Sequence, residues 1–276
     1  MRLANLDNEV YFKKVFTNPE IFTAFVKDIT GVEVNHAKIE TEKQLDRKVA
    51  AIRFKLDIFA ESKKERVIIE IQRVDYDYSF DRFLHYFLAA LVDLQRSSRD
   101  YAFKQDVYTI VVLTAPYIVK DKTGKLIQDE VLVSDFNPRT LDQKVRDIYP
   151  HKLIFLNPNH PSDTTPKNTR DWLQLISESI KNPESPNINL KNPSIKKAAE
   201  IANLDTMPES VLGAAKIAES KKKTKAIYEE IAREETKDEA IIGLYKNNIP
   251  IKIIATSLKV TEERVQKIID SYKHNK

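Results

Sequence analysis

Two acidic residues interrupt apolar segments that have the pattern of β-strands. Asp57 lies in FKLDIF, and Glu70 lies in VIIEIQ. Because side chains alternate along a strand, Glu70 and Gln72 lie on the same face. A carboxylate in such a strand is costly to desolvate unless it is paired or binds a metal ion. Two carboxylates from adjacent strands suit a hard divalent cation such as Mg²⁺, which takes oxygen ligands and retains waters for substrate phosphates.

A second interpretation of the same two residues needs no chemistry. Antiparallel sheets often have one solvated face. Asp57 and Glu70 could lie on that face and pair with nearby Arg53, Lys55 or Arg73. The spacing alone leaves both interpretations open.

The elements that would position these residues follow from hydrophobic periodicity. Alternation over 49–61 and a β-branched run over 67–74 flank the polar turn ESKKER and predict a β-hairpin. Residues 80–96 have the apolar spacing of an amphipathic helix, and VYTIVVLT at 107–114 predicts a buried strand. Further strands are expected at VLVSDF and HKLIFLNP. Two short helices, separated at Asn18-Pro19, are expected over 7–29.

These elements predict an α/β fold with a mixed central sheet flanked by helices. A helix is expected from Trp172 to about Lys181, and a proline- and asparagine-rich linker over 182–195. We therefore expect a first domain over 1–181 and a small all-helical region over 196–276.

Composition excludes several classes of protein and site. The 276 residues contain no cysteine, which rules out disulfide scaffolds, thiolate zinc sites and cysteine nucleophiles. No apolar stretch approaches the roughly 20 residues of a membrane span, and no signal peptide is evident at the N-terminus. We expect a cytoplasmic protein without a membrane partner. The net charge of +4 falls in the last third of the chain, which is compatible with nucleic-acid binding.

The order of these motifs resembles the PD-(D/E)XK nuclease superfamily, in particular its Rpn-type branch of recombination-promoting nucleases and transposases. An early Asp7 precedes the segment FKKVF, Asp57 precedes the E-x-Q strand that contains Glu70 and Gln72, and Arg82 and Tyr86 lie four apart on the next helix. The resemblance covers about residues 7–114. It implies a restriction-endonuclease-like core and a metal-dependent nuclease that acts on DNA.

The resemblance also implies roles for individual residues. Asp57 and Glu70 would be catalytic and would hold Mg²⁺, or Mn²⁺ in its place, together with the backbone carbonyl of Ile71. Gln72 would take the catalytic position that the wider superfamily gives to lysine. An amide can orient a water molecule there but cannot supply a positive charge.

Three further residues are candidates for accessory roles. Asp7 would be a helper carboxylate, although a helix N-cap would explain it equally well. Arg82 and Tyr86 share a helix face and could contact a phosphate. Alternatively, Arg82 pairs with a local Asp and Tyr86 packs in the core.

The C-terminal segment from 247 to 272 resembles a helix-turn-helix. Its last helix would offer Arg264, Lys267 and Lys273 to DNA. Lys259 stands where that motif commonly has glycine. A helical hairpin that packs on the core or mediates formation of a homodimer remains the alternative.

Together these features predict a Mg²⁺-dependent DNA endonuclease, a phosphodiester hydrolase linked to transposition or DNA recombination. The alternative is a DNA-binding or regulatory protein on a nuclease-like core that does not cleave. The sequence does not separate a DNA target from an RNA target.

Overall fold

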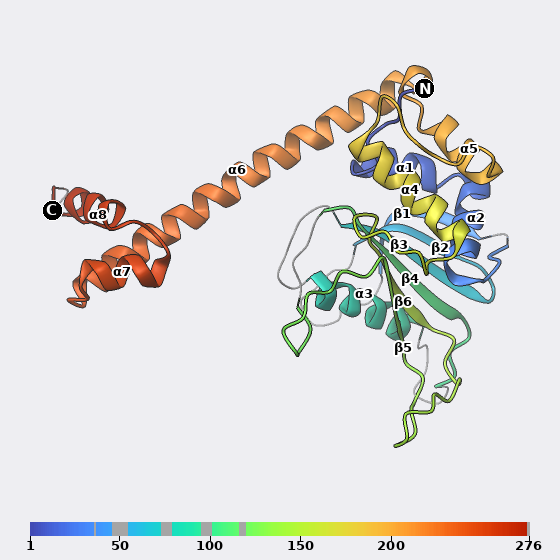
Figure 1. The fold of residues 1–276 in the computed structure, drawn as a ribbon, viewed down its shortest axis with the longest axis horizontal. Coiled ribbons are helices and arrows are strands. Elements are labelled where there is room, and N and C mark those ends of the chain that lie inside the picture. The colour runs from blue at the N-terminus through green and yellow to red at the C-terminus, as the bar shows by residue number, and fades with distance from the viewer. Residues whose placement is uncertain (36, 46–54, 73–78, 95–100, 116–119, 275–276) are drawn as a thin grey trace. The chain divides into compact units, whose positions relative to one another are not determined.

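The computed structural model describes all residues except 36, 46–54, 73–78, 95–100, 116–119 and 275–276 (Figure 1). The start of the strand predicted over 49–61, Arg53 and Arg73 lie outside the described residues. The chain divides into two units, Met1–Ala215 and Lys216–Lys276. Within the described part of the chain, no helix combines the length and the apolar character that crossing a bilayer requires.

Two short helices begin the first unit, as the break at Asn18-Pro19 predicts. Helix α1 spans Glu9–Phe16, and α2 spans Pro19–Thr30. The Asn18 side chain accepts hydrogen bonds from the first turn of α2, where Pro19 has no backbone N–H to leave unsatisfied. Gly31 ends α2 in the left-handed conformation, with φ of 79°. Glycine has no Cβ and so adopts this conformation without steric cost.

A mixed six-stranded sheet forms the centre of the first unit. Its spatial order is β1-β2-β3-β4-β6-β5. Strands β1–β2–β3 are antiparallel neighbours, β3, β4 and β6 run parallel, and β5 returns antiparallel to β6. The strand bounds are β1 Lys38–Gln44, β2 Lys55–Glu61, β3 Glu65–Gln72, β4 Asp106–Leu113, β5 Val131–Asp135 and β6 Lys152–Leu156.

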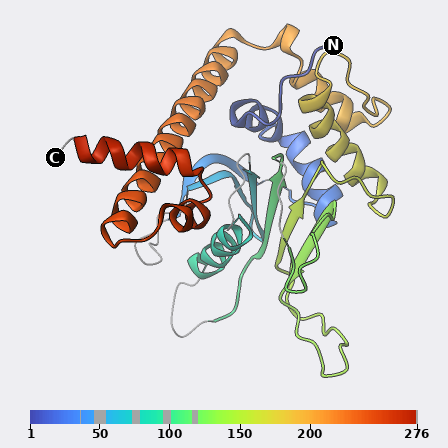
Figure 2. The ribbon, with the colours of Figure 1, turned by 60° about the vertical axis from the view of Figure 1, so that its left-hand side comes forward.

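Helices cover both faces of this sheet (Figure 2). Helix α3 (Ser79–Asp93) packs its Phe83 and Phe87 on one face. The other face is covered by α1, α2, α4 (Lys167–Lys181) and α5 (Pro193–Ile201), whose apolar side chains form the main core with Trp172. The indole N–H of Trp172 donates to Asp28 Oδ2 at 2.8 Å, which satisfies the one polar group of this buried ring.

The second unit is helical. Helix α6 (Glu209–Lys246) follows the short 3₁₀ turn η1 (Leu204–Thr206) and continues from the first unit into the second. Helices α7 (Ile251–Leu258) and α8 (Glu262–His274) pack on its end around Ile241, Ile254 and Val265. Lys259 joins α7 to α8 with a left-handed φ of 52°. The turn thus has the conformation for which glycine is usual in a helix-turn-helix.

The observed division lies beyond the linker expected over 182–195. Helix α5 starts at Pro193, and its Ile195, Ala198 and Ala199 are buried in the main core of the first unit. Proline and asparagine in this segment form helix caps rather than a spacer: the Asn192 side chain caps α5, and Pro193 occupies its first turn.

Candidate active site

Asp57 and Glu70 lie on neighbouring antiparallel strands, and the carboxylate of each accepts a backbone hydrogen bond from the other strand. Ile58 of β2 is in register with Ile69 of β3. Because the strands are antiparallel, Asp57 and Glu70 are the next two residues to face each other across the pair. The Asp57 N–H donates to Glu70 Oε1 at 3.0 Å, and the Ile71 N–H donates to Asp57 Oδ2 at 3.2 Å. These two hydrogen bonds, one in each direction between the strands, therefore hold the two carboxylates side by side.

The environment of these carboxylates contradicts the solvent-exposed interpretation. Glu70 is only 2% exposed. Burial, followed by the charge of Asp57, raises the pKa of Glu70 well above its ordinary value. Burial also raises the pKa of Asp57, although the nearby Lys13 ammonium opposes the shift. Two desolvated carboxylates with raised pKa values, of which Asp57 raises that of Glu70, form a site that favours a bound cation.

Lys13 of α1 supplies a positive charge directly beside Asp57. Its Nζ lies 3.4 Å from Asp57 Oδ1, 3.3 Å from Glu42 Oε1 and 3.7 Å from Glu9 Oε2. The Lys13 side chain is only 14% exposed. Burial lowers the pKa of Lys13, but Asp57, Glu9 and Glu42 together outweigh burial, so its pKa lies above the ordinary value. The ammonium is therefore charged at neutral pH.

Glu42 approaches this lysine from an unusual point in β1. It stands opposite Asp57, between the registered pairs Thr41↔Ile58 and Lys43↔Leu56. Its φ is 57°, a left-handed conformation that has a steric cost for a residue with a Cβ. Glu42 also pairs with Lys55 at 2.8 Å. Lys55, one of the partners considered for Asp57, is thus engaged elsewhere.

Gln72, Arg82 and Tyr86 form a polar group on the α3 side of the sheet. Arg82 Nη1 lies 3.4 Å from Gln72 Oε1, and its Nε and Nη2 donate to Tyr86 Oη at 3.2 and 3.0 Å. Burial lowers the pKa of Arg82, but the Tyr86 hydroxyl and the charges of Glu70 and Asp57 raise it more. Arg82 thus interacts electrostatically with both carboxylates. Asp75 and Asp77, which could serve as a local partner of Arg82, lie outside the described residues.

Asp7 lies at the carboxyl end of β3 and β4 and does not cap α1. The Asn8 side chain caps that helix by accepting from Val10 N. The Thr114 hydroxyl lies 2.6 Å from Asp7 Oδ1 and 3.1 Å from the Gln72 carbonyl oxygen. The structure therefore connects Asp7 to the end of β3 through Thr114.

The oxygen donors of this site suit Mg²⁺ or Mn²⁺ by their chemistry. Hard divalent cations take carboxylate and carbonyl oxygens, and Mg²⁺ commonly uses one or two carboxylates with water completing the shell. Asp57 and Glu70 provide two such groups, and a bound cation would offset the cost of burying their negative charges. Among the described residues there is no group of three His, Asp or Glu side chains with metal-binding geometry. The fit therefore depends on this pair and the neighbouring backbone.

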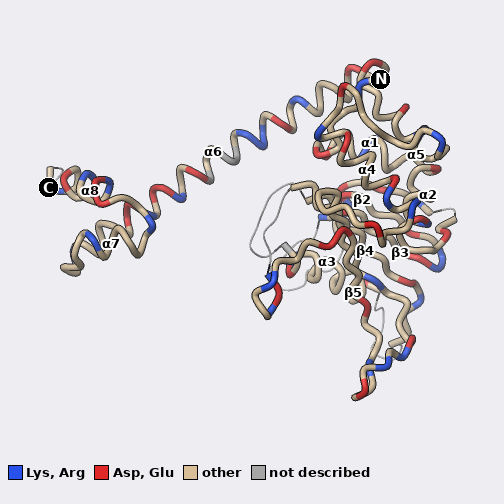
Figure 3. The backbone as a smooth tube through the Cα atoms, in the orientation of Figure 1, with Lys and Arg blue, Asp and Glu red and all other residues tan. Residues whose placement is uncertain are grey.

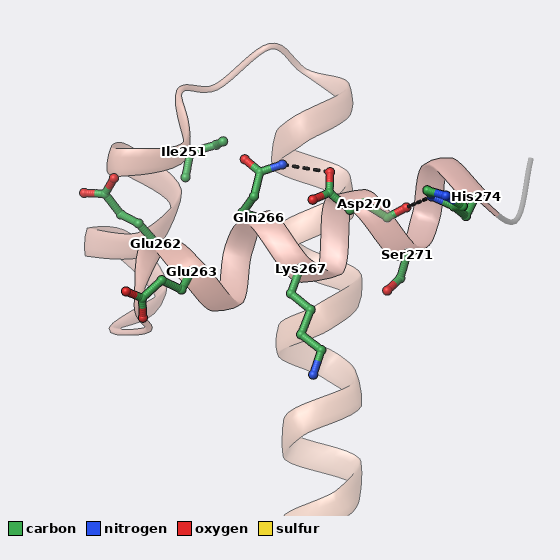
Figure 4. A pocket seen from close by; sticks show the side chains of 8 residues that line it. All are labelled: Ile251, Glu262, Glu263, Gln266, Lys267, Asp270, Ser271 and His274. Carbon is green, nitrogen blue, oxygen red and sulfur yellow. Dashed lines mark hydrogen bonds between the residues drawn. The ribbon is translucent and has the colours of Figure 1, made fainter.

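The three basic residues predicted to contact DNA on α8 have different surroundings. Arg264 Nη2 donates to Asp238 at 2.7 Å and Nη1 pairs with Glu234, so the guanidinium connects α8 to α6. Lys273 Nζ lies 5.3 Å from the centre of the Tyr245 ring. Lys267 is one of the residues that line an open groove, together with Glu262, Glu263 and Asp270 (Figure 4). Lys267 and Lys273 remain candidates for DNA contact.

Sequence reasoning did not assign roles to Lys13, Glu42 or Thr114. Lys13 and Asp57 are 44 positions apart, so no local spacing connects them. The only signal was the position of Lys13 in FKKVF, where it directly follows the buried Phe12. Glu42 lies in KIETEKQ, whose mostly polar pattern does not predict the edge strand β1.

Comparison with known proteins places this geometry in a family. Neither the curated proteins nor the solved structures that were compared gave a match. The model of one family, the PD-(D/E)XK nuclease family transposases, matches residues 6–239 and so spans the sheet, both carboxylates and most of α6. The mixed six-stranded sheet with flanking helices agrees with the restriction-endonuclease-like fold of that superfamily. The chain belongs to the PD-(D/E)XK nuclease family transposases.

Proposed function

We propose that this chain is a divalent-metal-dependent endonuclease that hydrolyses phosphodiester bonds in DNA. Membership of a transposase family implies DNA as the partner. The observation that carries the proposal is the Asp57–Glu70 pair, in which a fully buried glutamate with a raised pKa is bonded to the backbone of a second acidic residue. Buried charged groups are usually paired or bind a metal ion, and carboxylates with strongly raised pKa values cluster at functional sites.

In this proposal Asp57, Glu70 and the Ile71 carbonyl hold one divalent cation. A bound Mg²⁺ would polarise the scissile phosphate and lower the pKa of a coordinated water. Asp57 and Glu70 must both be ionised to bind it. Their raised pKa values therefore predict that metal affinity increases with pH.

Lys13 takes the electrostatic role that Gln72 cannot perform. Its ammonium lies 3.4 Å from Asp57 and would face the negative charge that develops on the phosphate. Gln72 would orient the attacking water through its amide. Arg82, which interacts with both Gln72 and Tyr86, would hold a phosphate oxygen from the α3 side.

Conversion of supercoiled plasmid to nicked and linear forms tests this proposal. We expect the wild-type chain to cut with Mg²⁺ or Mn²⁺ and not with EDTA. Asp57→Asn and Glu70→Gln should each lower the rate by at least about a hundredfold, since each removes a ligand charge while keeping the shape. Glu40→Gln is the matched control, because Glu40 is a β1 carboxylate that pairs with Lys38 and Lys43 at the surface.

Two outcomes would change the proposal. If the folded chain binds plasmid but does not cut it with either metal, the protein is a DNA-binding module on a nuclease-like core. If Asp57→Asn and Glu70→Gln cut as fast as the wild type, the site is elsewhere. A matched RNA substrate in the same assay identifies which nucleic acid is the target.

A further inference from the structure

The middle of α6 is exposed over a long stretch, and within the second unit Arg264 of α8 reaches it only at Glu234 and Asp238, on its C-terminal part. From Lys216 to Glu239, none of the described side chains is buried. Large apolar side chains nevertheless occur at its centre: Tyr228 is 68% exposed and Ile231 is 48% exposed. In proteins, most helix stability comes from packing of an apolar face. This part of α6 thus has the exposed apolar surface of a helix that packs against another.

Charge is distributed unevenly along the same helix (Figure 3). The segment 216–225 contains five lysines and one glutamate, a net charge of +4. The segment 229–239 contains six acidic residues, one arginine and one lysine, a net charge of −4. Tyr228 lies between the two blocks, and Ile231 lies near the start of the acidic block. The helix is therefore complementary in charge to a second copy of itself that runs in the opposite direction.

We propose that two copies of this chain associate by antiparallel packing of α6. The contact stripe consists of Thr224, Tyr228, Ile231 and Glu235, which recur every three or four residues and so share one helix face. A two-fold axis between residues 229 and 230 places Tyr228 of one copy against Ile231 of the other. It also places the basic block of each copy beside the acidic block of the other. A parallel, in-register pair would instead bring like charges together.

The first test is the oligomeric state of the full chain, measured by sedimentation equilibrium over a range of concentrations. We expect a monomer–dimer equilibrium in the wild type. Tyr228→Glu/Ile231→Glu should raise the dissociation constant at least roughly tenfold, because it places four carboxylates at the centre of the interface. Glutamate is a good helix former, so the helix content in circular dichroism should not fall.

Ile253→Glu is the matched control for that variant. Ile253 is an apolar residue of α7 that is 54% exposed and lies outside the stripe. Its substitution should leave the dimer unchanged. A wild-type chain that is monomeric at every concentration would overturn the proposal. A dimer that survives Tyr228→Glu/Ile231→Glu would place the interface elsewhere and would overturn it as well.

Disulfide trapping determines the direction of the two helices, because the natural chain contains no cysteine. Thr224 and Glu235 lie at equal distances from the proposed axis. A mixture of Thr224→Cys and Glu235→Cys chains should form a mixed disulfide rapidly under mild oxidation. Thr224→Cys chains alone should form a disulfide with one another only slowly, because the two cysteines would lie on opposite sides of the proposed axis. Rapid self-crosslinking of Thr224→Cys would show a parallel pair and contradict the antiparallel arrangement.

Discussion

At the scale of single residues, Glu70 connects stability to the proposed activity. Its pKa is raised in the folded chain mainly by burial, so the folded state holds the Glu70 proton more tightly than the unfolded state does. A carboxyl group shifted in this direction contributes stability at low pH, and that contribution is lost as pH rises from its ordinary pKa through the raised one. Without a cation, Glu70 should therefore destabilise the fold at neutral and alkaline pH.

Glu70→Gln should accordingly stabilise the metal-free chain at pH 8. The glutamine oxygen can still accept from Asp57 N, while the buried charge is gone. We expect the free energy of unfolding to increase by about 1–3 kcal/mol, and each kcal/mol corresponds to a rise in Tm of roughly 2–4 °C. The increase should disappear near pH 4. Thermal unfolding in EDTA, followed by circular dichroism between these pH values, measures it. A gain that is independent of pH would contradict the assignment, and Glu40→Gln should show none.

A bound cation should reverse that ranking. Mg²⁺ that binds only the folded chain stabilises it in proportion to the logarithm of its concentration over its dissociation constant. Added Mg²⁺ should therefore raise the Tm of the wild type and leave that of Glu70→Gln unchanged. Thermal shift measurements with increasing Mg²⁺ test this independently of cleavage. Equal shifts in both chains would place the cation away from Glu70.

Lys13 provides the third prediction at this scale. Lys13→Gln removes the ammonium beside Asp57, so the pKa of Asp57 should rise further and transition-state charge should lose its nearest cation. We expect cleavage to fall roughly 10²–10³-fold. The loss should be greater at low pH, where Asp57 without Lys13 is more readily protonated. The neighbouring Lys14 is exposed, so Lys14→Gln should cut at the wild-type rate in the same plasmid assay.

At the scale of elements, the backbone at Lys259 offers a test of the turn between α7 and α8. Its left-handed conformation has a steric cost for lysine that glycine does not have. Lys259→Gly should stabilise the second unit by about 0.5–1 kcal/mol, whereas Lys259→Val should destabilise it, because a β-branched side chain fits this conformation poorly. Urea unfolding of both variants measures the difference. A Val variant as stable as the Gly variant would contradict the observed turn.

Most elements were predictable from sequence because their signals are local. The break at Asn18-Pro19, the hairpin around ESKKER and the apolar run of β4 each lie within a short window, and each is confirmed. Edge strand β1 was missed because KIETEKQ contains only one large apolar residue. The expected linker over 182–195 and the observed division after Ala215 differ because the same residues that favour loops also cap α5, which packs with the first unit. Asp57 and Glu70 stood out as candidates because an acidic residue in an apolar strand is locally unusual, whereas the approach of Lys13 depends on tertiary structure.

At the scale of the whole molecule, the net charge belongs entirely to one unit. Lys216–Lys276 contains fourteen basic and ten acidic residues, which equals the surplus of +4 of the full chain. The unit that contains Asp57 and Glu70 is therefore neutral overall. DNA affinity depends largely on cations that neutralise phosphates. We thus expect the second unit to supply most of the salt-sensitive attraction and the first to supply the chemistry.

This division of roles predicts how substitutions affect binding and cutting. Lys252→Gln/Lys267→Gln/Lys273→Gln removes three exposed lysines of α7 and α8. At low salt and in EDTA, DNA binding should weaken roughly tenfold or more, and the dependence on salt should become shallower by up to about 0.9 for each lost phosphate contact. Fluorescence anisotropy across a salt series measures both quantities. Lys181→Gln/Lys191→Gln/Lys196→Gln removes the same charge from exposed positions of the first unit and should have a smaller effect. If the variant of the first unit weakens DNA binding as much as the variant of the second unit, only total charge matters and α8 has no special role. If neither triple variant weakens DNA binding, the first unit contacts DNA without help from the second.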